Sequence, residues 1–210
     1  VSFGRHSGKL TFQEVEVGVD ELTFQLSFRK SKKIVRAPLG GSFNVENSVA
    51  SIAGLLALGY SFDATTESIR SVRPVPGRFE SVKNNLDIGV IVDYAHTPDA
   101  LQKLLESVRD LSPKEVITVF GCGGDRDKTK RPIMAKAVSA NSDLTIVTSD
   151  NPRTEDPQTI LDEVLEGVLP EAEAIAILDR KEAIGYAIRH AEPGDVVVIA
   201  GKGHENYQII

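Results

Sequence analysis

The sequence predicts an α/β protein. Its larger part is a Rossmann-like, doubly wound, mostly parallel sheet, and a smaller unit of strands and helices precedes it. The first observation is a series of almost continuous apolar runs, at residues 88–92, 116–120, 144–148, 174–178 and 196–200. Such runs are typical of parallel strands buried on both faces. The second is that helical stretches separate the runs, at roughly 98–110, 132–140, 157–169 and 180–191. This alternation indicates βαβ units.

The first 75 residues have a different pattern. Short segments rich in β-branched and aromatic residues predict strands at 10–12, 22–28 and 34–37, with Lys30–Lys33 as the turn before the last strand. Residues 38–42, a Pro- and Gly-containing string, end this pattern.

Two helices follow. Apolar residues spaced three and four positions apart predict a helix from Phe43 to Tyr60, and a second is expected from Asp63 to Val72, with Asp63 or Ser61 as its N-cap. The string Pro74–Gly77 then predicts a linker. We therefore expect two domains, 1–75 and 76–210.

Composition excludes several classes of protein. Of the 210 residues, 41% are hydrophobic and 26% charged, which argues against a disordered or collagen-like chain. The single cysteine permits no internal disulfide and fits a reducing compartment. No run of about 18 apolar residues predicts a membrane-spanning helix, and the first six residues lack the apolar region of a signal peptide.

Charge is unevenly distributed along the chain. Residues 1–77 carry nine basic and seven acidic side chains, whereas residues 78–210 carry 15 and 23. An acidic second half argues against non-specific nucleic-acid binding, which needs a basic face. A bound anion would therefore need a local cluster of cations or backbone N–H groups.

Polar or glycine-rich strings follow each predicted parallel strand, where ligands of such sheets bind. In the string from Gly121 to Pro132, backbone N–H groups could face an anion. Lys128, Lys130 and Arg131 crowd the predicted helix start at Pro132, where cations oppose the helix dipole, so we expect an anionic ligand or a solvated basic turn. Cys122 is expected to pack as a small residue rather than act as a nucleophile.

The glycine pattern of this string excludes two nucleotide-binding motifs. Arg126 occupies the position of the third glycine in the dinucleotide fingerprint, which argues against a dinucleotide-dependent oxidoreductase. The 210 residues also contain no G-x-x-x-x-G-K-[ST] string, the P-loop motif.

Three other strand ends carry groups suited to binding. In Asp150-Asn151-Pro152-Arg153 the proline fixes a turn that aims an amide and a guanidinium at one place, although an ordinary Asx turn explains it as well. The string from Gly201 to Glu205 puts Lys, His and Glu beside a permissive backbone.

The third strand end is Asp93 to Pro98. Thr97 fits an N-cap with Pro98 at the first helical position, which leaves Asp93 and His96 without a structural role. Arg78, just after the linker, is either solvent-exposed or reaches a phosphate across the domain junction.

Together, and in the same order, these strings resemble those of the Mur ligases, most closely the MurE type. The strings are 41–47, 76–80, 93–98, 121–132, 150–153 and 201–205. The resemblance covers essentially the whole chain. It implies that 1–75 is the C-terminal part of a central ATPase domain and that 76–210 is a C-terminal amino-acid-binding domain. The UDP-binding domain, P-loop and carbamylated Lys of the family have no counterpart here.

The resemblance also implies an activity. Mur ligases of this type join an amino acid to UDP-N-acetylmuramoyl-L-alanyl-D-glutamate with ATP and Mg²⁺, through an acyl phosphate, in peptidoglycan synthesis. That process serves cell wall biogenesis, cell shape and cell division. The expected partners are the UDP-MurNAc-dipeptide, meso-diaminopimelate and ATP, with no nucleic acid and no membrane. We expect a cytoplasmic monomer whose Mg²⁺ ligands lie mainly outside this chain.

Residue roles follow from the same resemblance. Lys130, Arg131 and His96 match catalytic or phosphate-facing positions; Asn44 and Asn47 match the adenine side, Arg78 the phosphates and Asp93 the ribose. The positions for meso-diaminopimelate are Arg126, Asp150, Asn151, Pro152, Arg153, Gly201 and Glu205. Relatives that add L-lysine replace the arginine of the 150–153 motif, so Arg153 favours diaminopimelate. The alternatives are a non-catalytic module that binds amino acid or nucleotide, and an L-lysine-adding relative.

Overall fold

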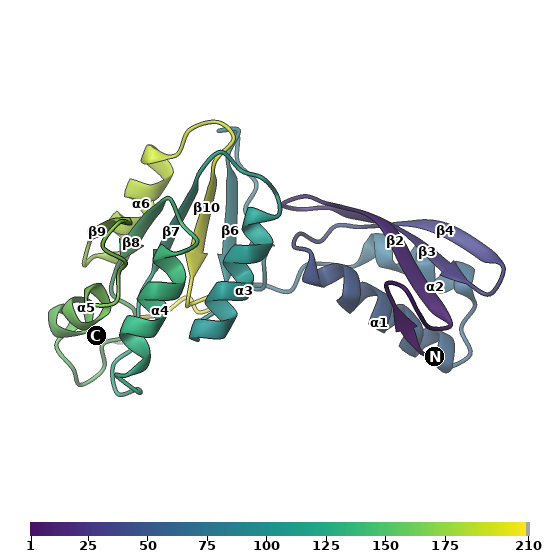
Figure 1. Ribbon diagram of the computed structural model, residues 1–210, viewed down its shortest axis with the longest axis horizontal. Helices are drawn as coiled ribbons and strands as arrows, with labels where there is room; N and C mark the ends of the chain where they lie inside the picture. The colour runs from purple at the N-terminus through teal and green to yellow at the C-terminus, as the bar shows by residue number, and fades with distance from the viewer. Residues whose placement is uncertain (209–210) are drawn as a thin grey trace. The chain divides into compact units, whose positions relative to one another are not determined.

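The computed structural model describes residues 1–208 and divides into two compact units, Val1–Val75 and a second that begins at Pro76 (Figure 1). Each unit has its own hydrophobic core. The assignment of the first unit to a central ATPase domain stays a prediction.

The first unit packs a four-stranded sheet against helices (Figure 1). Its strands are β1 (Phe3–Gly4), β2 (Leu10–Val17), β3 (Leu22–Phe28) and β4 (Ser31–Ala37), in that spatial order. Its helices are α1 (Phe43–Ala57), α2 (Phe62–Ser68) and a 3₁₀ turn, Ile69–Ser71. Alternate residues of β3, Leu22, Phe24 and Leu26, are buried, as the period of two in a strand requires. They share a core with the apolar stripe of α1.

Two local predictions in this unit are wrong. The turn predicted at Lys30–Lys33 is shorter: Phe28 pairs with Ser31, so only Arg29 and Lys30 connect the strands. Arg29 adopts φ 56°, as the residues of tight hairpin turns do. The helix predicted to run from Asp63 to Val72 is α helix only to Ser68; Ser61 is its N-cap and accepts a hydrogen bond from Ala64 N.

The second unit is a six-stranded sheet in the order β5-β6-β10-β7-β8-β9, in which only the β5–β6 pairing is antiparallel. The strands are β5 (Glu80–Ser81), β6 (Gly89–Asp93), β7 (Val116–Phe120), β8 (Leu144–Val147), β9 (Glu173–Ala176) and β10 (Val196–Ala200). The helices are α3 (Pro98–Arg109), α4 (Lys130–Ser139), α5 (Pro157–Leu165) and α6 (Arg180–His190). The predicted doubly wound α/β architecture is confirmed (Figure 1).

The agreement between the predicted apolar runs and the observed strands depends on how deeply each strand is buried. Every residue of β7 and β8 is buried, because both lie inside the sheet. The run at 174–178 was expected to be buried as well, and this is wrong: β9 is an edge strand and is partly exposed. Thr97 caps α3 by accepting from Ala100 N, with Pro98 in the first turn, as predicted.

Within residues 1–208, no helix is both long enough and apolar enough to cross a lipid bilayer.

Candidate functional site

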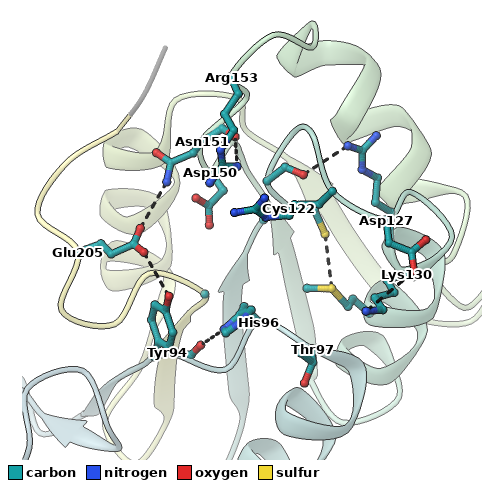
Figure 2. A pocket seen from close by; sticks show the side chains of 16 residues that line it. Tyr94, His96, Thr97, Cys122, Asp127, Lys130, Asp150, Asn151, Arg153 and Glu205 are labelled. Atoms are coloured by element: carbon teal, nitrogen blue, oxygen red, sulfur yellow. Dashed lines mark hydrogen bonds and ion pairs between the residues drawn. The ribbon is translucent and has the colours of Figure 1, made fainter.

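A cavity of about 330 Å³ opens at the carboxyl ends of β6, β7, β8 and β10 (Figure 2). This is the edge of a parallel sheet where ligands bind. Its lining includes most of the binding residues that the sequence suggests in this unit. They are His96, Arg126, Lys130, Arg131, Asp150, Asn151, Arg153, Gly201 and Glu205. Their roles stay predictions, but their proximity is a property of the fold.

The glycine-rich loop after β7 packs directly against the loop after β8. A β-carbon at Gly121 would lie 2.1 Å from Thr148 O, and one at Gly124 would lie 1.8 Å from Pro152 O. At Gly123 it would lie 2.7 Å from Arg153 Nη1. The close approach of a second backbone therefore requires Gly121 and Gly124, and the Arg153 side chain occupies the space beside Gly123. The sequence alone interpreted these glycines as a cradle for an anion.

Hydrogen bonds join the same two loops. Gly124 N donates to Asn151 O at 2.9 Å, and Arg153 Nη1 donates back to Gly124 O at 2.9 Å. Asp125 N donates to Glu155 Oε1 at 2.6 Å, and Thr154 Oγ1 to Asp125 Oδ1 at 2.5 Å. These bonds join the two loops into one continuous wall of the cavity.

Arg131 anchors this wall from beneath. Its side chain is 2% exposed and donates to both oxygens of Glu155, at 2.9 and 3.0 Å, to Glu163 on α5, and to Gly123 O at 3.3 Å. Lys128 Nζ adds a contact of 2.9 Å to Glu155. Hydrogen bonds from Arg131 and Lys128 lower the pKa of Glu155 to about 2.

This differs from the expectation for the start of α4. The helix begins at Lys130, not at Pro132. Arg131 and Lys128 need no anionic ligand to balance their positive charge, because both already form ion pairs with Glu155 and Glu163. Arg131 was expected to face the phosphate region; its guanidinium is instead enclosed in its own unit.

Two of the lining cations do point to solvent. Arg126 and Lys130 are exposed, and their polar contacts within residues 1–208 are long: Arg126 Nη1 to Asp125 O at 3.4 Å and Lys130 Nζ to Asp127 at 3.9 Å. They give this wall a positive charge available to a ligand.

Arg153 has a φ of 55°, a region that residues with a β-carbon seldom adopt. Nη1 donates to Gly124 O and, at 3.2 Å, to Asn151 O, which fixes the half-buried side chain. Within residues 1–208, Nε and Nη2 of Arg153 have no hydrogen-bond acceptor. The guanidinium keeps donors for a carboxylate.

Glu205 supplies an acid to the same cavity. Its Oε1 accepts from the hydroxyl of Tyr94 and its Oε2 from Asn151 Nδ2, each at 3.3 Å (Figure 2). Asp150 contributes a second carboxylate, 3.3 Å from Lys202 Nζ. An acid and a guanidinium, both bonded to Asn151, thus share one cavity.

The nucleotide-side candidates of this unit surround Tyr94. The Arg78 guanidinium lies over the Tyr94 ring, 4.9 Å from its centroid, and His96 Nδ1 is 2.7 Å from Tyr94 O. Asp93 is buried and each of its oxygens accepts a backbone N–H at 2.7 Å, from Phe79 and from Ala95. Asp93 therefore holds the loop that carries Arg78, a role that the sequence did not indicate.

Asn44 and Asn47 belong to the first unit. Asn44 Nδ2 donates to Gly40 O at 2.7 Å, and Asn47 Nδ2 donates to Asn44 Oδ1 at 3.0 Å. The two amides form a small network at the start of α1.

The comparisons decide the family. Residues 77–203 match the family model described as the Mur ligase, glutamate ligase domain. This chain belongs to the Mur ligase family.

Curated relatives of this Mur ligase chain match most or all of its length. A UDP-N-acetylmuramoyl-L-alanyl-D-glutamate–2,6-diaminopimelate ligase of Geobacillus kaustophilus is 46% identical over the whole chain and 43% of its own length. The ligase of the same name from Trichormus variabilis is 52% identical over 83% of this chain and 36% of its own length. The chain spans less than half the length of these relatives.

Solved structures agree. A UDP-N-acetylmuramoyl-L-alanyl-D-glutamate–2,6-diaminopimelate ligase matches 98% of the chain and 42% of its own length, with a TM-score of 0.75 and 38% identity. The alanine ligase MurC of Thermotoga maritima matches 97% of the chain and 44% of its own length, with a TM-score of 0.70 and 22% identity, which shows a shared fold.

Sequence reasoning assigned no role or partner to several groups in this Mur ligase domain. Lys202 and Arg180 are buried cations beside Asp150, and Tyr94 contacts Glu205. The only signal for Lys202 was its place between two glycines at a strand end. Cys122 packs as predicted: burial raises the pKa of its thiol to about 12.

Proposed function

We propose that this chain is part of an ATP-dependent ligase that adds meso-diaminopimelate to UDP-N-acetylmuramoyl-L-alanyl-D-glutamate in peptidoglycan synthesis. The names of the relatives support the reaction. The observation that carries the substrate is the pairing of opposite charges around Asn151: its backbone oxygen accepts from Arg153, and its side chain donates to Glu205.

The ligand's chemistry matches that pairing. The distal carbon of meso-diaminopimelate carries a carboxylate and an ammonium, whereas lysine has only the ammonium. Arg153 Nε and Nη2 would bind the distal carboxylate, and Glu205 would accept from the distal ammonium. Arg126 would bind the carboxylate beside the attacking amine. Asp150, Pro152 and Gly201 would shape the cavity.

The roles of the other residues concern ATP, which supplies the phosphoryl group that activates the carboxylate. Arg78, Lys130 and His96 are exposed and would face the phosphates; Asp93 would hold the Arg78 loop. Arg131 would act by supporting the Lys130 loop. Asn44 and Asn47 would serve the adenine from the first unit.

Within residues 1–208, no group of three or more His, Cys, Asp or Glu side chains is arranged to hold a metal ion. That the Mg²⁺ ligands lie mainly outside this chain stays a prediction. No step is derived through the metal.

The test is Arg153→Ala in the full-length ligase. With lysine as ligand, a half-buried guanidinium loses its anion, so we expect the wild type to prefer diaminopimelate by roughly 10²–10⁴-fold in kcat/KM. The variant should raise the diaminopimelate KM sharply, leave the ATP KM nearly unchanged and narrow this preference. Arg189→Ala, an exposed site on α6, is the control. If Arg153 only fixes the turn, the variant loses stability but keeps its selectivity, and the substrate proposal is wrong.

A second candidate is a non-catalytic module that binds amino acid or nucleotide. The observation behind it is that the 210 residues contain no P-loop string. Phosphate release by the purified chain, with ATP and both substrates, distinguishes the two. An L-lysine-adding enzyme is a variant of the first proposal, and the same kinetics with two amino acids exclude or establish it.

A further inference from the structure

Lys202 is a buried charged residue to which no role has been assigned above. It follows β10, and its side chain is 11% exposed. Its Nζ donates to Tyr207 O at 2.8 Å and to Asn151 Oδ1 at 3.1 Å, and it lies 3.3 Å from Asp150 Oδ1. An ammonium has three N–H donors, and three oxygens lie near this one: two from the loop after β8 and one from the backbone of Tyr207.

The contact with Asn151 fixes the orientation of that amide. Because an ammonium can only donate, the atom of Asn151 facing Lys202 must be Oδ1. The amide nitrogen then points the other way, and there Nδ2 donates to Glu205 Oε2 at 3.3 Å. A carboxylate can only accept, so both neighbours require the same orientation. Asn151 is 3% exposed, so water does not compete for either end.

We propose that Lys202 is a positioning residue of the amino-acid site. It fixes the Asn151 amide and, through that amide and a longer contact of 3.9 Å from its own Nζ to Glu205 Oε2, the Glu205 carboxylate. The inference rests on the proposed function and adds a residue to it. Tyr94 holds the other oxygen of Glu205. Without Lys202 the amide is free to turn Oδ1 toward Glu205, where two acceptors repel, and the carboxylate moves from its place.

Charge neutralisation is a different role that Lys202 could have, since Asp150 lies beside it. A second buried cation, Arg180, also interacts electrostatically with Asp150 and is 8% exposed. The two roles separate by substitution. Lys202→Met removes the charge and the donors. Lys202→Arg keeps the charge, but a planar guanidinium does not match three oxygens placed around one nitrogen.

The experiment measures steady-state kinetics of the full-length ligase with diaminopimelate, lysine and ATP. For Lys202→Met we expect the diaminopimelate KM to rise roughly 10- to 100-fold, the loss typical of a misplaced binding group, with the ATP KM unchanged. Lys202→Arg should also raise the diaminopimelate KM. Lys181→Met, an exposed lysine on α6, is the matched control and should behave as wild type. Thermal unfolding of each variant is recorded alongside.

A wild-type diaminopimelate KM in either folded Lys202 variant overturns the inference, whatever the change in stability. If only Lys202→Arg keeps the wild-type diaminopimelate KM, Lys202 acts through its charge and the inference is wrong. If Lys202→Met does not fold, the arginine variant and an NMR measurement decide. In the 210-residue chain, the Asn151 side-chain amide should give one set of signals in wild type and a shifted or averaged set in Lys202→Arg; identical signals contradict the inference. Failure of the proposed function looks different, because the wild type itself would then not use diaminopimelate.

Discussion

A β-carbon at Gly124 would lie 1.8 Å from the carbonyl oxygen of Pro152, a distance that no relaxed structure tolerates. The clash is with backbone rather than with the end of a flexible side chain, so one of the two loops must move. Gly124 also exchanges hydrogen bonds with the neighbouring loop, through Asn151 O and Arg153 Nη1. Because Gly124 has no side chain, the two loops can approach closely enough for Arg153 Nη1 to bond Gly124 O, and this contact positions Arg153.

We therefore predict that Gly124→Ala destabilises the second unit by about 2–3 kcal/mol or more, since overpacking forces a backbone shift. Gly185→Ala is the control. Gly185 lies within α6, and the atom nearest to a β-carbon added there would be Arg189 Nη1, 3.0 Å away at the end of a flexible side chain. Because alanine favours a helix over glycine by about 1 kcal/mol, this variant should be as stable as wild type or more so. Urea unfolding of the three proteins measures both effects. Equal stability of Gly124→Ala and wild type would mean that the loops are not in contact.

The sequence predicted which residues line the cavity better than it predicted which side chains those residues contact. Residues after β6, β7, β8 and β10 line one cavity because parallel strands end at one edge, a rule that the sequence pattern makes usable. The partners of Arg131 could not be predicted in the same way. Glu155 and Glu163 are 24 and 32 positions away and meet Arg131 only after α4 and α5 pack. The three oxygens around Lys202 depend on tertiary structure for the same reason.

At the scale of elements, α4, α5 and the loops before them are joined by the Arg131 cluster. Arg131 is buried, Glu155 contacts it with both oxygens and also accepts from Asp125 N, and Lys128 lies on the outer side. Because the partners come from two helices and two loops, this cluster sets the spacing of the wall that carries Arg126 and Lys130.

We predict that Glu155→Gln and Arg131→Met each lower the melting temperature by several degrees, and that the double variant loses less than the sum of the two. Removing Glu155 leaves the buried Arg131 with only Glu163 as its counter-charge, and removing Arg131 leaves Glu155 with only Lys128. The double variant loses the Arg131–Glu155 interaction only once, so its loss should be smaller than the sum. Lys103→Met is the control, because its pair with Asp99 is exposed and such pairs contribute little. Additive losses would contradict the coupling.

The same cluster gives a pH dependence. The pKa of Glu155 falls from 4.5 to about 2 on folding, so the unfolded chain takes up the proton first as pH falls. The stabilisation from this group is complete above pH 4.5 and disappears between pH 4.5 and 2. In that window, Glu155→Gln should lose less stability than wild type as the solution is acidified.

Elements in the sheet interior were the easiest to predict. β7 and β10 have the predicted bounds, since continuous apolar runs coincide with burial on both faces. The β3–β4 turn was predicted too long. Its length follows from the pairing of Phe28 with Ser31, which the sequence does not show, and a run of lysines indicates solvent exposure rather than a turn. The charged side chains of Ser31–Lys33 belong to an edge strand, where exposure is expected.

At the scale of the whole molecule, the chain has two separate cores. One contains Phe24, Val49 and Ile52, the other Ile117, Val119 and Ile146, and no residue is common to both. The segment between them, residues 71–76, is exposed throughout. Since the residues of each core come from one unit alone, we expect the two units to unfold as separate cooperative units.

We predict that the exposed segment is cut first in limited proteolysis and that the two units unfold separately. A protease of broad specificity should release fragments that end near residues 72–77, as measured by mass spectrometry, before any cut appears within 88–200. Calorimetry should show two transitions. Val49→Ala, which opens a cavity in the smaller core, should lower only one of them, and Val119→Ala only the other, each by an amount typical of deleting two buried methyl groups. Early cuts within 88–200, or a single transition that both substitutions shift equally, would show that the two cores depend on each other for stability.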